Sequence, residues 1–86
     1  MKDYISITKK NAEKIMRLSL TDTALFMRLV MKADAETGMV DIEHATTGNQ
    51  IPQTAIYKAI NRIEKAGLII QTGTAATIQN WPDFQL

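Results

Sequence analysis

The chain has 86 residues, a formal net charge of +1 and a hydrophobic content of 45%. This length is typical of one compact domain, and the hydrophobic content is too high for an intrinsically disordered chain. The absence of cysteine excludes disulfides, thiolate metal sites and a cysteine nucleophile. We therefore expect a single domain over residues 1–86, made of an N-terminal arm and helix (1–18), a core (21–80) and an aromatic tail (81–86).

The charges are unevenly distributed along the chain. Residues 1–17 carry five basic and two acidic side chains (+3), residues 18–50 carry two and five (−3), and residues 51–86 carry three and two (+1). The two ends can therefore meet phosphate, whereas the middle is repelled by it. No apolar run is long enough to span a membrane, and the N-terminus lacks the apolar stretch of a secretory signal. We expect a cytoplasmic protein without membrane contact.

The N-terminal half predicts an extended arm and two helices. Residues 4–8 alternate like a strand or extended arm, and residues 9–18 form a helix with Ala12, Ile15 and Met16 on one face. The next helix begins near Thr21, the expected N-cap, and Asp22 complements the positive end of its dipole. It runs to Lys32, with so many apolar residues that we expect burial on most of its circumference, and it ends in a turn over 35–38. Four methionines are expected to fill the core: Met16, Met27, Met31 and Met39.

The C-terminal half predicts a strand, two helices and a hairpin. Residues 39–42 form a short strand, and Asp41 is expected to cap a second helix over 43–49. Pro52 suits the first turn of a third helix, in which Ile56, Ile60 and Ile63 face the core and which ends at Gly67. Strands over 68–72 and 75–79 are joined by a turn at Gly73-Thr74.

The stretch Ile51–Ile69 resembles the winged helix-turn-helix consensus of bacterial regulators and replication proteins. It has an apolar residue, a polar turn, exposed polar positions, the triplet Ile56-Tyr57-Lys58 and a final Ala66-Gly67-Leu68-Ile69. The resemblance implies an α+β fold, mainly helical, with a small antiparallel β-hairpin wing. A closer resemblance is to RepL-type plasmid replication-initiator proteins, whose ending is similar to Asn80-Trp81-Pro82-Asp83-Phe84. Two features depart from that family: residues 43–49 lack its second-helix pattern, and the wing has no Arg or Lys.

The resemblance makes residues 52–66 a recognition helix that enters the major groove of double-stranded DNA. Gln53 and Asn61 can pair with adenine, Lys58 with guanine, and Tyr57 with a thymine methyl group or a phosphate. Arg62 and Lys65 suit phosphates. The remaining predicted contacts are Thr54 on the helix and Thr72 and Thr74 on the wing, where a plain hairpin turn is an equally good interpretation.

Two further surfaces have open interpretations. A basic face near the N-terminus can contact flanking phosphate or simply keep the protein in solution; it consists of Lys9, Lys10, Lys14 and Arg17. Trp81 and Phe84 can cover the domain's own core or form a homodimer contact, and self-packing is slightly favoured.

No pattern predicts catalysis. His44 is the only histidine, Asp41 and Glu43 point in different directions, and no glycine-rich phosphate loop is present. We expect no enzyme activity, metal, cofactor or small-molecule substrate. The predicted function is sequence-specific DNA binding in plasmid or phage replication initiation or in transcriptional regulation. The alternative, favoured by the nearly neutral charge and the uncharged wing, is a winged-helix protein–protein interaction module without DNA binding.

Overall fold

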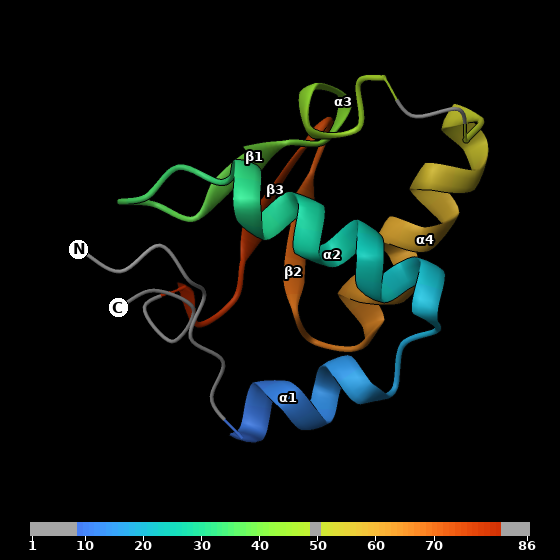
Figure 1. Ribbon diagram of the computed structural model, residues 1–86. Coiled ribbons are helices and arrows are strands. Elements are labelled where there is room, and N and C mark those ends of the chain that lie inside the picture. The colour runs from blue at the N-terminus through green and yellow to red at the C-terminus, as the bar shows by residue number, and fades with distance from the viewer. Residues whose placement is uncertain (1–8, 49–50, 82–86) are drawn as a thin grey trace.

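The computed structural model describes residues 9–48 and 51–81 (Figure 1). The predicted extended arm over 4–8 and Phe84 of the tail lie outside the described residues. The elements follow in the order α1 (Lys9–Met16), α2 (Leu20–Lys32), β1 (Met39–Asp41), α3 (Ile42–Ala45), α4 (Gln53–Lys65), β2 (Ile69–Thr72) and β3 (Ala75–Ile78). The predicted α+β fold with a hairpin after the long helix is confirmed.

The three strands form one antiparallel sheet in the order β1-β3-β2. Val40 of β1 pairs with Ala76 of β3, and Ile69 of β2 pairs with Ile78 of β3. The β2–β3 hairpin turns at Gly73, whose φ of +61° is a conformation that glycine adopts without steric cost. Gly67, with φ +83°, has the predicted left-handed conformation after α4.

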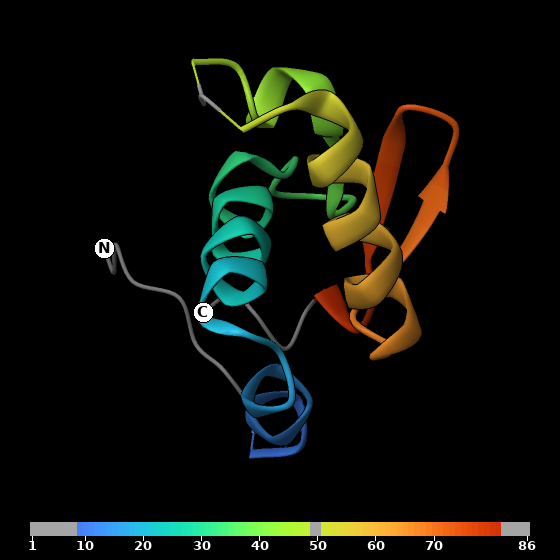
Figure 2. The same cartoon turned by 90° about the vertical axis from the view of Figure 1, so that its right-hand side faces the viewer.

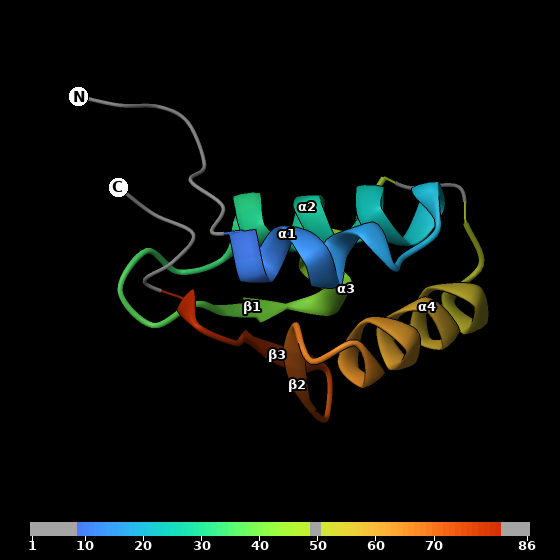
Figure 3. The same ribbon diagram turned by 90° about the horizontal axis from the view of Figure 1, so that it is seen from below.

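The core lies where α2, α4 and the sheet meet. Its fully buried side chains include Phe26 and Leu29 of α2, Ile60 and Ile63 of α4, and Ile69 of β2. Helix α4 contacts both α2 and β2, and Figure 2 shows it between α2 and the hairpin. Viewed from below (Figure 3), α4 and the hairpin lie on the side of the molecule away from α2. The predicted isoleucine row of α4 is therefore the central apolar surface of the domain.

The start of α2 differs from the prediction. Ser19, not Thr21, is the N-cap: its hydroxyl accepts a hydrogen bond of 3.1 Å from the Asp22 amide. Ser19 has the extended backbone conformation that a cap needs, whereas Thr21 already lies inside the first helical turn. The prediction of Asp41 as the cap of α3 is confirmed, because its carboxylate accepts from the amides of Glu43 and His44.

Helix α3 is one turn long, shorter than the predicted 43–49. It ends at Ala45, and at the C-cap both the Thr46 amide (3.1 Å) and the Thr46 hydroxyl (2.8 Å) donate to the Ile42 carbonyl. This short helix and the loop after it lead directly into Pro52 and α4. Within the part of the chain that the structure describes, no helix has the length and apolar character needed to cross a membrane.

The predicted burial of the methionines is largely wrong. Met16, Met31 and Met39 are 83%, 68% and 50% exposed, and only Met27 packs against the core. In α1 Asn11 is buried and Ile15, one turn further on, packs against the core as predicted, but Met16 lies in solvent. Helix α2 is not buried on most of its circumference either, because its outer side, which includes Leu20, Ala24, Arg28 and Met31, is exposed.

Trp81 covers the domain's own core, as the favoured interpretation held. It is buried, and its indole Nε1 donates a hydrogen bond of 2.9 Å to the Ala35 carbonyl. Gly38 lies under the ring with φ +73°, and a Cβ at this position would lie 2.6 Å from Trp81 Cγ. The tight turn before β1 thus depends on a residue with no side chain.

Gly38→Ala is expected to destabilise the domain by about 2–4 kcal/mol, because it adds both left-handed strain and a clash with Trp81. Gly73→Ala is the matched control: its φ is also positive but its Cβ would meet nothing within 4 Å, so we expect about 1–2 kcal/mol from the backbone alone. Urea unfolding followed by fluorescence of the single tryptophan measures both. Equal losses for the two variants would show that the Trp81 contact does not matter.

Candidate nucleic-acid interface

Helix α4 has one buried face and one fully exposed face. Ile56, Ala59, Ile60 and Ile63 are buried. On the opposite side an exposed row follows the spacing i, i+4, i+7, i+11, which places its members along one line of the helix. This row, which we call the α4 ridge, consists of Thr54, Lys58, Asn61 and Lys65.

The α4 ridge is polar and cationic. It carries two lysines, an amide and a hydroxyl, and it includes no acid. None of its four side chains forms a hydrogen bond or ion pair with another residue in the ranges 9–48 and 51–81. Side chains of these types donate to base edges and phosphate oxygens. The ridge therefore presents unused hydrogen-bonding capacity over the length of the helix.

The beginning of α4 adds to this positive character. Pro52 is the N-cap residue and supplies no side-chain hydrogen bond, and the first turn contains no acid. The N-terminal end of a helix carries partial positive charge and attracts anions. Gln53, the first residue of α4, is exposed at this end.

Tyr57 does not point outward, and this prediction is wrong. Its side chain packs against the core, and its hydroxyl is buried and has no hydrogen-bond partner among the described residues. Residue 57 lies one helical turn before Ile60 and two before Glu64, on the flank of α4 that meets the sheet. On that flank Glu64 Oε2 accepts a hydrogen bond of 2.8 Å from the Gln71 amide of β2. This flank therefore holds the hairpin against the helix.

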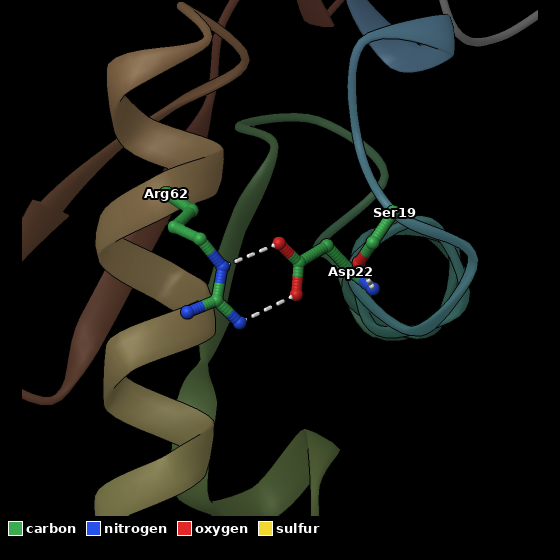
Figure 4. Close-up of polar contacts among 3 residues, drawn as sticks. All are labelled: Ser19, Asp22 and Arg62. Atoms are coloured by element: carbon green, nitrogen blue, oxygen red, sulfur yellow. Dashed lines mark hydrogen bonds and ion pairs between the residues drawn. The ribbon is translucent and has the colours of Figure 1, made fainter.

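Arg62 lies on the opposite flank and is paired with Asp22 of α2 (Figure 4). Its Nε donates 2.7 Å to Asp22 Oδ2, and its Nη2 donates 2.9 Å to Oδ1. The Asp22 side chain is 3% exposed, whereas the Arg62 side chain is 57% exposed. Such a two-pronged pair is both strong and directional. Arg62 thus links α4 to α2 in addition to any role toward phosphate.

The pair sets the charge state of the buried carboxyl group. The hydrogen bonds from Arg62 lower the pKa of Asp22 below its ordinary value of 3.8, against the opposing effect of burial, and the charge of Arg62 and the Ser19 hydroxyl lower it further. The same bonds raise the pKa of Arg62. Both groups are therefore ionised throughout the neutral range.

Helix α1 lies next to the C-terminal end of α4. Lys14 Nζ donates a hydrogen bond of 3.4 Å to the carbonyl oxygen of Gly67. Lys9, Lys10 and Arg17 are exposed on α1. Both earlier interpretations of this basic face, phosphate contact and solubility, are compatible with its position.

The hairpin presents hydroxyl groups and no cation. Thr72 and Thr74 are exposed beside the turn, and Gln71 Nε2 donates 3.3 Å to the Gly73 carbonyl. Elsewhere in the described ranges, no group of three or more His, Asp or Glu side chains is placed to hold a metal ion.

Comparisons of the chain with protein-family models, with curated proteins and with solved structures found no match.

The geometry sorts the nine predicted contact residues into three groups. Four lie together on the α4 ridge, and three more are exposed, Gln53 at the start of α4 and Thr72 and Thr74 at the hairpin turn. Tyr57 and Arg62 are engaged with the sheet side of the core and with α2. Asp22, the partner of Arg62, was not predicted, because no sequence signal links residues 40 positions apart.

The Asp22–Arg62 pair makes stability depend on pH in the acidic range. The pKa of the Asp22 carboxyl group is lower in the folded state than its ordinary value of 3.8. Such a group stabilises the folded state fully at pH values above 3.8, and this stabilisation is lost as the pH falls through the pKa of the folded state. At pH 7 we expect Asp22→Asn to cost about 1 kcal/mol, a modest figure because Arg62 is largely hydrated. The difference in free energy of unfolding between wild type and variant should shrink as the pH drops below 3.8. Urea unfolding at several pH values measures this difference. A difference that stays constant would contradict this role of the pair.

Proposed function

We propose that this protein is a cytoplasmic, non-enzymatic winged helix-turn-helix domain that binds double-stranded DNA sequence-specifically through α4. Replication initiation on a plasmid or phage and transcriptional regulation are the two tasks that such binding would serve. The observation that supports the proposal is the α4 ridge: an exposed, acid-free row of DNA-compatible side chains directly opposite the buried isoleucines.

The dimensions of α4 suit the major groove. Its 13 residues correspond to a length of about 20 Å, and the major groove of B-DNA, about 12 Å wide, admits one α-helix. In this orientation Asn61 can pair with adenine, Lys58 with guanine, and Lys65 with a phosphate. Thr54 and Gln53 would face the DNA near the N-terminal end of the helix, where recognition helices make base contacts.

The hairpin is positioned to act as the wing. The bond between Glu64 and the Gln71 amide holds β2 against α4, and Figure 3 shows α4 and the hairpin on the same side of the molecule, below α2 in that view. Thr72 and Thr74 would then face the backbone beside the groove and donate their hydroxyl hydrogens to phosphate oxygens. Because the wing carries no Arg, we expect no minor-groove insertion by this hairpin.

Lys58→Ala and Lys65→Ala are expected to weaken binding to a pool of duplexes of about 20 base pairs, measured by fluorescence anisotropy at about 50 and 200 mM salt. Loss of a phosphate contact by Lys65 should reduce the slope of log affinity against log salt by about 0.9. Lys32→Ala, an exposed lysine on α2 away from the ridge, is the matched control. Unchanged affinity in both ridge variants, with wild-type circular dichroism, would refute the assignment of the ridge. No duplex affinity at low salt in wild type would favour a protein interaction module instead.

Thr74→Arg tests the position of the wing by gain of function. A guanidinium added beside a phosphate should raise duplex affinity by about threefold to tenfold and steepen the salt dependence by about 0.9. Thr37→Arg places the same charge in an exposed turn before β1 and serves as the control. Equal gains in the two variants would indicate only a change in net charge and would argue against a wing next to DNA.

A further inference from the structure

A groove of about 380 Å³ lies between α2 and α4. Three of the residues that line it are buried and form its floor: Leu25, Ile56 and Ala59. Two exposed apolar side chains also line it, Met31 at 68% and Ile51 at 40% exposure. Ligand and peptide sites typically combine such an apolar lining with a volume of this size. The α4 ridge contributes none of the lining residues, so the groove is a second surface of α4.

The shape of the groove suits a helix. Its α2 wall is formed by Thr21, Ala24, Arg28 and Met31, which follow one line of the helix over about 15 Å. This length equals about three turns of a partner helix. Ala24 on one wall and Ala55 on the other have small side chains, which allow another helix to approach closely.

The charges of the groove favour an acidic partner. Its only charged lining residues are Arg28 and Arg62, and no acid lines it. The charge of Arg62 is balanced by Asp22. Arg28 has no carboxylate partner within the described ranges, and its only hydrogen bond there is a long one of 3.5 Å from Nη1 to the Ala45 carbonyl. The Arg28 guanidinium can therefore still receive a carboxylate from outside in a two-pronged pair.

We propose that this groove binds an amphipathic helix of a partner protein, with apolar residues on one face and an Asp or Glu that pairs with Arg28. In two-fold pairing the same acid-free patch would lie on both copies, so a second copy of this chain would offer Arg28 no carboxylate from this face. DNA does not fit the groove, because the lining is mainly apolar and only one cation lacks a counter-charge. The proposal goes beyond DNA binding and does not depend on it.

The test starts from selection with the full chain. A displayed library of about 15-residue amphipathic sequences, long enough to fill three helical turns, is selected against the immobilised protein. We expect the enriched sequences to share apolar residues at i, i+3 or i+4, and i+7, together with an Asp or Glu. The two best are then synthesised with a fluorescent label and titrated by anisotropy. Failure to enrich such sequences would overturn the proposal.

Two exposed methionines provide a matched pair of variants. Met31→Glu should lower peptide affinity by about tenfold or more, because it places a charge on the apolar lining. Met16→Glu alters a more exposed methionine on α1, outside the groove, and should change affinity less than about twofold. Equal effects of the two variants would place the peptide elsewhere and overturn the site.

Arg28 is tested by charge exchange. Arg28→Glu should weaken binding of the acidic peptide by about tenfold, and replacing the peptide's acid with Lys should restore binding to this variant alone. Loss without restoration would contradict the pairing. Sedimentation of the wild-type protein over a range of concentrations tests whether a second copy of the chain binds in the groove instead. Self-association that Met31→Glu abolishes would mean that a second copy fills the groove, contrary to the proposal.

Discussion

The arrangement of this domain depends on one row of buried isoleucines on α4. Ile56, Ile60 and Ile63 follow the helical spacing and are almost entirely removed from solvent. Full burial of each such side chain contributes about 1.5–3 kcal/mol. Rotating α4 about its axis would expose these side chains to water and would therefore cost several times that free energy. The row therefore decides which residues of the helix face outward. The α4 ridge exists because its polar residues occupy the positions opposite this row.

Polar contacts on the two flanks of α4 refine the orientation that burial imposes. On one flank the Arg62 guanidinium holds the buried Asp22 carboxylate of α2, and on the other Glu64 accepts from the Gln71 amide of β2. Directional bonds of this kind select one rotational setting where apolar packing alone would tolerate several. The same helix thus carries two exposed surfaces, a cationic ridge opposite the buried isoleucines and an apolar groove on the side of α2. One helix can in this way serve two different partners.

The sequence predicted the features that depend on local chemistry and periodicity. The isoleucine row, the Asp41 cap, the left-handed Gly67 and the hairpin turn at Gly73 all follow from neighbouring residues, and each is confirmed. The errors concern features set by distant contacts. Asp22 lies in the first turn of α2 as predicted, but the sequence did not indicate that its carboxylate is buried and paired with Arg62. Met31 looked like core filler, but it lines an open groove, and Tyr57 turned inward because its flank meets the sheet. Periodicity locates an apolar face without indicating which of its edges another element covers.

We propose above that the α4 ridge and the hairpin turn face DNA. The most direct test of this proposal is an amide nitrogen–proton NMR titration of the labelled chain with a short duplex at low salt. We expect the largest shifts on residues 53–65 of α4 and on the turn around Gly73, and little change on β1 and the outer side of α2. Shifts concentrated on α2 and the groove, or no shifts at any duplex concentration, would contradict the account and leave the groove as the principal binding surface of the protein.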